Sequence, residues 1–250
     1  MLSLKETKYK IVQQGIDKIH KTSKQKFILG FIAGAMIAFA YWVFLKVMYL
    51  KQDLILASSL FPIGLIIILL VGGELATGNM MVVGTAYINK EVSGSDYIKN
   101  VLQISVFNIL GVLFVVMVTM VLDVFMDGVS ISELGYTLHE ITLSKTSSSP
   151  FQVFVSGMMC NWFVGLAVWL CNSVKEGVSK ILAIWFPIMI FVVLGFQHSI
   201  ANTFLLIATY VSSGGLSLLE MIINFVFSFI GNLLGGFFFV ATLYTWVSRD

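Results

Sequence analysis

The sequence predicts an all-α membrane protein with six transmembrane helices, arranged as two three-helix halves. Three observations support this fold class: the composition, six long apolar runs and an internal repeat. Of the 250 residues, 58% are hydrophobic and only 11% are charged, whereas about a quarter of the residues of a soluble domain are charged. The mean hydropathy of +0.95 also excludes a disordered chain, which needs low hydrophobicity.

Residues 1–26 are predicted to form a cytoplasmic amphipathic helix ahead of the first span. Within this segment, Ile11, Val12, Ile16 and Ile19 recur at helical spacing, opposite lysines and glutamines. Two interpretations remain open. The favoured one is a helix that lies on the membrane surface, and the other is a plug that gates a pore.

The transmembrane domain is predicted to cover residues 27–248, in halves 27–124 and 151–248. A span needs about 20 apolar residues, and the sequence contains six runs of that length or more. The run after residue 26 is longer than the hydrophobic region of a signal peptide, so it is interpreted as a retained first span. The approximate runs are 27–50, 55–88, 101–124, 151–172, 181–210 and 221–247.

The second and fifth runs are too long to be single straight helices. As one helix, the 34 residues of 55–88 would reach about 51 Å, whereas the hydrocarbon core is about 30 Å thick. Glycines indicate where each helix breaks: Gly72 and Gly73 in the second run, and Gly195, after Pro187, in the fifth.

The distribution of basic residues predicts the orientation in the plasma (inner) membrane. Twelve of the fifteen lysines and arginines fall in inside segments if the N-terminus is inside, which places both termini in the cytoplasm. The twelve are Lys5, Lys8, Lys10, Lys18, Lys21, Lys24, Lys26, Lys90, Lys99, Lys175, Lys180 and Arg249. The three outside are Lys46, Lys51 and Lys145, the last in an acidic loop with Asp123, Asp127, Glu133 and Glu140.

Three similar offsets indicate an internal repeat. They align Gly30 with Gly157 (127 residues), Glu74 and Asn79 with Gln197 and Asn202 (123 residues), and Asn108 with Asn232 (124 residues). Because three spans is an odd number, the two halves must enter the membrane from opposite sides, which predicts an inverted repeat. In such repeats the broken helices meet near the midplane, where substrates bind.

Glu74 and His198 are the two side chains of strong acid–base character well inside the predicted spans. An ionisable group costs at least about 2.5 kcal/mol in the bilayer centre on insertion scales, so each is a functional candidate. For Glu74 the favoured alternative is structural, a carboxylate that accepts from amides freed by the break. For His198 a function is favoured, since imidazole offers a hydrogen bond or a proton near physiological pH.

Buried polar side chains stand around these two residues. Asn79, Asn108 and Asn202 are interpreted as ties between helices. For Asn161 and Asn232, the residues alone leave an even choice between a helix tie and a pore-lining group.

The sequence offers no clear site for a metal, a cofactor or a nucleic acid. The histidines His20, His139 and His198 lie in three different regions, which disfavours a metal or haem site. Cys160 and Cys171 stand about 16 Å apart along one predicted helix, too far for a disulfide. A net charge of +2 without a basic face disfavours a nucleic-acid partner.

Two other function classes lack their motifs. An intramembrane enzyme would use Glu74 and His198 as acid and base, but no HExxH or Gly-x-Ser-x-Gly motif accompanies them. A neutral-solute pore of aquaporin type lacks paired Asn-Pro-Ala motifs, since the only prolines are Pro62, Pro150 and Pro187.

Four segments together resemble the formate/nitrite transporter family of anion channels. GELATGN at 73–79 is similar to its interrupted second helix, and NWFVGLAVW at 161–169 to its fourth. The stretch that ends in GFQHSIAN at 195–202 resembles its fifth-helix signature, and IGNLLGG at 230–236 resembles its sixth helix. The similarity covers essentially the whole chain.

The resemblance implies an aquaporin-like six-helix protomer, assembled as a homopentamer, with one pore per subunit for small inorganic or one-carbon anions. It makes His198 the central pore histidine, places Thr77 on the loop that interrupts the second helix, and makes Asn161 and Asn232 their polar neighbours. Lys145 matches a lysine that draws anions into the outer vestibule. The outer constriction is matched by Phe61, Leu65 and Val164, and the inner one by Leu75 and Phe191.

Two departures from the family pattern bear on the substrate. Gln197 stands where the formate and nitrite branches carry glutamate, and Ala76 stands at a constriction position that is often phenylalanine. This combination resembles the hydrosulfide-channel branch, so hydrosulfide is the expected anion, with formate or nitrite as alternatives. Channel conduction and proton-coupled transport both stay open.

Overall fold

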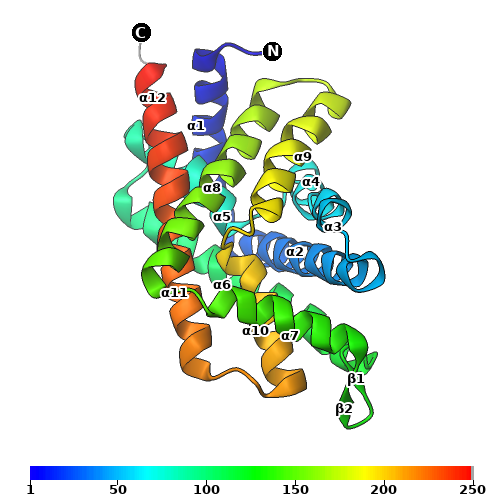
Figure 1. Ribbon diagram of the computed structural model, residues 1–250. Helices are drawn as coiled ribbons and strands as arrows, with labels where there is room; N and C mark the ends of the chain where they lie inside the picture. The colour runs from blue at the N-terminus through cyan, green and yellow to red at the C-terminus, as the bar shows by residue number, and fades with distance from the viewer. Residues whose placement is uncertain (249–250) are drawn as a thin grey trace.

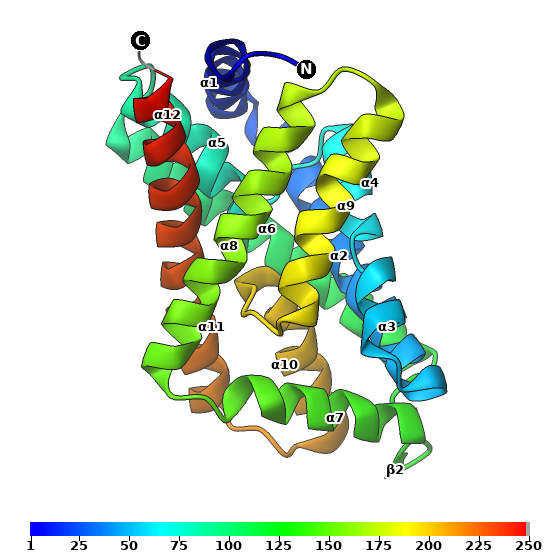
Figure 2. The same ribbon diagram turned by 45° about the horizontal axis from the view of Figure 1, so that its top comes forward.

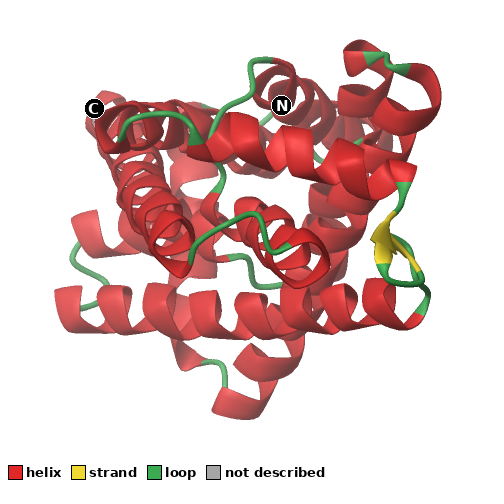
Figure 3. Cartoon of the chain, turned by 60° about the horizontal axis from the view of Figure 1, so that its bottom comes forward, coloured by secondary structure: helices red, strands yellow, loops and turns green. Residues whose placement is uncertain are grey.

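The computed structural model describes residues 1–248, and within them strand is limited to one short hairpin (Figures 1 and 3). Arg249, which enters the charge count above, lies outside the described residues. The chain begins with α1 (Leu4–His20), in which Ser3 and Glu6 form a capping box. After two residues, α2 (Ser23–Lys51) begins with a second capping box and contains the first predicted span.

The predicted second span consists of three helices, α3 (Leu54–Leu60), α4 (Ile63–Val71) and α5 (Ala76–Ile88). Gly72 ends α4 with a φ of +80°, a left-handed conformation that glycine adopts at little cost. The predicted break at Gly72 and Gly73 is therefore confirmed. A second interruption, at Pro62 between α3 and α4, was not predicted; proline has no N–H for the helix ladder.

The chain continues through α6 (Gly94–Val121) to the hairpin of β1 (Met126–Asp127) and β2 (Ser130–Ile131). The next helix, α7 (Glu133–Thr146), occupies the predicted outer loop, and α8 (Pro150–Ser173) matches the fourth predicted span. Pro150 stands in the first turn of α8, where a missing N–H costs nothing.

The fifth predicted span is divided into α9 (Gly177–Val193) and α10 (Ser199–Ser213). Gly195 has a φ of +68°, so the predicted break is confirmed. The last helical stretch contains α11 (Leu218–Leu234), a π-helical segment (Gly235–Thr242) and α12 (Leu243–Val247).

Five helical stretches within residues 1–248 are long and apolar enough to cross a membrane. The helices α9 and α10 are apolar but shorter, as the break between them requires. The five stretches are α2, α3 with α4, α6, α8, and α11 through α12.

Two helix pairs approach closely at glycines. In the contact of α2 with α6, a Cβ built on Gly111 would overlap the carbonyl oxygen of Phe31. In the contact of α8 with α11, a Cβ on Gly231 would overlap the carbonyl oxygen of Phe154. Small residues of this kind let apolar helices pack backbone against backbone.

The amphipathic helix α1 packs on protein. Ile11 is fully buried and Val12 is 7% exposed, and Ile11 lies in an apolar cluster with Met81 of α5 and Trp169 of α8. A Cβ on Gly15 would meet α5, so the two helices touch. The membrane-surface interpretation is therefore wrong, because the apolar stripe meets a matching apolar surface on α5 and α8.

The two breaks lie between the two ends of the molecule (Figure 1). α1 and α12 lie at one end of the molecule, and α7 lies at the other (Figure 1). The break before α5 and the break before α10 lie between these ends (Figures 1 and 2). This arrangement brings side chains from both halves of the sequence to the centre.

Candidate functional site

Asn108 of α6 holds the first break together. Its Nδ2 donates to the carbonyls of Gly30 and Glu74, each at 2.8 Å, and its Oδ1 accepts from the N–H of Ala76 at 2.9 Å. The side chain is fully buried. It thus satisfies backbone groups within the break, at the start of α5 and on α2, which lipid cannot do.

Asn232 of α11 holds the second break in the same way. Its Nδ2 donates to the carbonyls of Gly157 at 2.8 Å and Gln197 at 2.9 Å, and its Oδ1 accepts from the N–H of Ser199 at 2.9 Å. Each partner of Asn232 stands 123 or 127 residues after the corresponding partner of Asn108, and these are the offsets of the internal repeat. Both N–H groups of Asn232 are used, so in this structure it ties backbone segments together.

A second pair of buried networks also repeats. Asn79 donates to Glu74 Oε2 at 2.7 Å and to Asn100 Oδ1 at 2.9 Å. The interpretation of such asparagines as ties between helices is confirmed. The corresponding donor in the other half is Asn202, which bonds to Gln197 Oε1 at 2.5 Å and Asn224 Oδ1 at 3.0 Å.

His198 is the N-cap residue of α10. Its Nδ1 accepts from the N–H of Ala201 at 3.1 Å, which leaves the proton of the neutral ring on Nε2. Nε2 lies 3.1 Å from Thr77 Oγ1, and both side chains are buried. Thr77 lies in the first turn of α5 and not, as the resemblance implies, on the loop before it. This bond therefore joins the N-terminal ends of α5 and α10.

Asn161 of α8 lies beside this pair. Its Nδ2 donates to the carbonyls of Thr77 at 3.1 Å and Asn232 at 2.7 Å. Its Oδ1 and the hydroxyl of Ser199 are buried and lack hydrogen-bond partners among residues 1–248. Unpaired buried polar atoms are rare in proteins, so these two are available to a polar ligand or water.

A cavity of about 210 Å³ lies between α7 and the second break; we call it the α7 cavity. Lys145 Nζ donates there to the carbonyls of Gly195 at 2.6 Å and Phe196 at 3.1 Å. Within residues 1–248 it forms no ion pair. Burial lowers the pKa of Lys145 to about 8. The cavity is lined by Tyr41, Phe61, Lys145, Phe191 and His198, among others.

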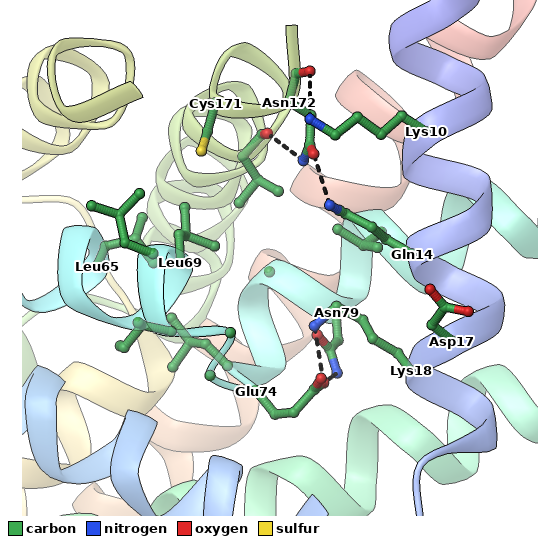
Figure 4. A pocket seen from close by; sticks show the side chains of 18 of the residues that line it. Lys10, Gln14, Asp17, Lys18, Leu65, Leu69, Glu74, Asn79, Cys171 and Asn172 are labelled. Atoms are coloured by element: carbon green, nitrogen blue, oxygen red, sulfur yellow. Dashed lines mark hydrogen bonds and ion pairs between the residues drawn. The ribbon is translucent and has the colours of Figure 1, made fainter. Parts of the chain in front are cut away.

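A larger cavity, of about 340 Å³, lies between α1 and the first break; we call it the α1 cavity (Figure 4). Lys18 Nζ lies 3.0 Å from Glu74 Oε2, and Lys21 Nζ lies 3.2 Å from Glu74 Oε1. The carboxylate therefore binds α1 instead of the amides freed by the break. That structural interpretation of Glu74 is wrong, because Asn108 takes the N–H of Ala76.

Apolar side chains lie between the two cavities. The rings of Phe61 and Phe191 are 6.0 Å apart at 87°, and those of Phe191 and His198 are 6.0 Å apart at 26°. Phe61 and Phe191 line the α7 cavity, whereas Leu65 and Leu75 line the α1 cavity. The resemblance instead groups Leu65 with Phe61 and Phe191 with Leu75. Val164 and Ala76 are buried and line neither cavity.

Four site residues were missed in the sequence. Lys18 and Lys21 entered only the charge count, and nothing local marks them as partners of a residue more than fifty positions away. Asn100 and Asn224 were detectable, since they stand 124 residues apart, the offset that relates Asn108 to Asn232.

No cluster of three histidine, cysteine, aspartate or glutamate side chains occurs within residues 1–248. Cys160 and Cys171 are both free and lie on α8.

Comparison with known proteins bears on the family. Residues 5–246 match the formate/nitrite transporter family. The chain is 35% identical to the transporter YrhG of Bacillus subtilis, over 93% of this chain and 88% of that one. It is 34% identical to the formate channel BtFdhC of Bacillus thuringiensis, over 94% of this chain and 91% of that one.

Two solved structures share the fold. A structure described as an FNT family ion channel has a TM-score of 0.89 at 23% identity, and covers 96% of this chain and 98% of that one. A pentameric formate channel with formate bound has a TM-score of 0.76 at 24% identity, with 91% and 98% covered. The family match spans nearly the whole chain, so this protein belongs to the formate/nitrite transporter family, whose members are multi-pass transporters and channels for small anions rather than enzymes.

Proposed function

We propose that the chain forms a pore whose path runs from the α1 cavity past His198 and Thr77 to the α7 cavity. The observation that carries this proposal is the 3.1 Å contact between His198 Nε2 and Thr77 Oγ1. It joins the N-terminal ends of α10 and α5, and each helix N-terminus carries a partial positive charge. Lysines line the cavities on both sides. This electrostatic arrangement favours small anions.

At the centre of the path, a protein donor would replace a hydrogen bond that the anion loses when it gives up its hydration water. Phe61, Phe191 and Leu75 are apolar and at most 3% exposed, so they offer no replacement for hydration. The Nε2–H of His198 is the donor that replaces a lost hydrogen bond, or the proton source that lets the anion cross as its neutral acid. Conduction of the anion and proton-coupled crossing both use this donor.

Formate is the first substrate we propose. The relative at 34% identity is named a formate channel, and a protein of Methanothermobacter thermautotrophicus at 32% is named a probable formate transporter. Hydrosulfide is the second candidate, favoured by Gln197. Its amide is neutral and donates to the carbonyl of Lys145 at 2.9 Å, so the imidazole has no neighbouring carboxylate in this half.

We further propose a homopentamer of six-span, inverted-repeat protomers with both termini in the cytoplasm. The shared fold with a structure described as pentameric supports the assembly. The matched networks of Asn108 and Asn232 support the repeat. The α1 cavity is then the cytoplasmic mouth, and the α7 cavity the outer one.

Liposome flux tests the function. Purified protein is reconstituted, and uptake of formate, nitrite, hydrosulfide and chloride is measured against protein-free vesicles. Formate flux above chloride flux supports the proposal, and hydrosulfide flux above formate flux selects the second candidate. Absence of flux for every anion would contradict the pore. A proton-sensitive dye inside the vesicles distinguishes proton-coupled crossing from conduction.

A further inference from the structure

Lys10 and Lys180 both line the α1 cavity and have no carboxylate partner among residues 1–248. Lys10, on α1, donates to the carbonyl of Asn172 at 3.2 Å. The ammonium of Lys180, in the first turns of α9, makes no hydrogen bond within the described residues. Burial lowers the pKa of Lys10, and the positive charge of Lys180 lowers it further. The two ammonium groups therefore repel each other across one cavity.

The carboxylates of this cavity do not neutralise the pair. Glu74 is occupied by the two other lysines of the lining, Lys18 and Lys21. Asp17 lies on α1 seven residues after Lys10, about 10 Å along the helix axis, and it is exposed. Four lysines and two carboxylates line the cavity, which leaves a net charge of +2.

The end of the cavity that holds Lys10 is fixed by neutral groups. Gln14 of α1 donates to Asn172 Oδ1 at 2.8 Å, and Asn172 Nδ2 donates to the carbonyl of Val168 at 3.0 Å. Figure 4 shows Lys10 and Gln14 reaching from α1 to Asn172 on α8. The ammonium of Lys10 uses one of its three N–H groups in the bond to Asn172 and leaves two unused within residues 1–248. All three N–H groups of Lys180 are unused in the same range. The unused donors are those that an anion would take.

We propose that Lys10 and Lys180 form an anion-binding site in the α1 cavity, which captures the transported monovalent anion before it reaches His198. The inference rests on the proposed function and adds the binding site on the α1 side. It also assigns α1 a role, because two of the four lysines of the lining lie on α1 and a third, Lys21, is its C-cap residue. The helix is then a wall of the conduction path, and its loss weakens capture instead of opening a gate.

The test measures radiolabelled formate flux in vesicles of known orientation. Lys10→Gln and Lys180→Gln are each compared with wild type at low ionic strength, with the anion supplied from the α1 side or from the α7 side. We expect each variant to raise KM from the α1 side by roughly three- to fivefold, the effect of one nearby charge in a wet vestibule. The kcat, and KM from the α7 side, stay unchanged.

Matched variants keep the test decisive. Lys180→Arg retains the charge, so its formate KM from the α1 side is expected to equal that of wild type. Lys175→Gln removes an exposed lysine outside the cavity and is expected to leave this KM unchanged. An unchanged KM in Lys180→Gln, or an equal loss from both sides, overturns the site. Absence of formate flux in wild type refutes the proposed function instead, so the two failures are distinguishable.

Discussion

Leu75 and His198 occupy the same place in the two halves of the chain. Each is the N-cap residue of the helix that follows a break, with φ and ψ of −104° and 128° at Leu75 and −107° and 109° at His198. In each case a buried asparagine accepts from the next N–H. The backbone is repeated while the side chains differ, so one half places an apolar side chain at this position and the other places a polar one.

Replacing His198 by phenylalanine is expected to reduce anion flux by at least about a hundredfold. The variant loses the Nε2–H donor at the centre of the path and the Nδ1 acceptor for Ala201. The lost cap costs only about 1 kcal/mol, so the oligomer still assembles. Flux in liposomes and size-exclusion chromatography check both statements. Selective flux near the wild-type level in a well-assembled variant removes the histidine from the mechanism.

Anion flux is expected to fall at alkaline pH, because Lys145 loses its positive charge there. Its pKa of about 8 lies below the usual value, so the folded protein loses this charge as pH rises through 8. Anion capture from the α7 side then falls between pH 7 and 9, most at low ionic strength. Lys145→Arg stays charged and shows no such fall. The ratio of variant to wild-type flux across pH is the measurement, and a constant ratio contradicts the prediction.

Gln197→Glu is expected to raise formate flux relative to hydrosulfide flux. The new carboxylate still accepts from Asn202, but it cannot donate to the carbonyl of Lys145 as the amide does. Its negative charge stabilises a protonated imidazole at His198, which helps the weaker base formate most. Both fluxes are measured across pH in both proteins. An unchanged ratio and pH profile would show that Gln197 does not set the preference.

Glu74→Gln is expected to loosen α1. The variant leaves Lys18 and Lys21 without their carboxylate, a loss of about 1–3 kcal/mol after allowance for the partial exposure of the lysines. Hydrogen exchange of the α1 amides measures the effect, with Glu176→Gln as a matched change of an exposed carboxylate. Equal exchange in wild type and Glu74→Gln contradicts a role for the ion pairs in docking.

Gly111→Ala is expected to destabilise the contact of α2 with α6 by more than about 2 kcal/mol. The added methyl group would overlap the carbonyl of Phe31, so the backbones must separate. Gly177→Ala is the control, since nothing lies within 4 Å of a Cβ there. Thermal unfolding in detergent compares the two. Similar midpoints would show that the helices have room to move apart.

The sequence predicts the helices and their breaks because both depend on local properties. Run length gives the spans, and Gly72 and Gly195 mark positions where the chain must adopt positive φ. The interruption at Pro62 could not be predicted in this way, because proline also occurs at the first position of unbroken helices. The repeat is visible because Asn108 and Asn232 bond to backbone atoms whose positions repeat with them.

The surroundings of the site depend on contacts between distant segments, which one sequence does not record. The apolar stripe that contains Ile11 has the same sequence pattern whether it packs on lipid or on α5. Likewise, Lys18 contacts Glu74 only because α1 packs over the first break. The positions of His198 and Thr77 beside the two breaks could therefore be predicted, whereas the docking of α1 could not.

The short link between α1 and α2 has a consequence for any release of α1. Only residues 21 and 22 separate the two helices, so a detached α1 stays within reach of its docking surface at an effective concentration on the order of millimolar. Its return is a unimolecular step that dilution does not slow. A free peptide of residues 1–20 would have to reach millimolar concentration to compete, so the state of α1 is set within each subunit.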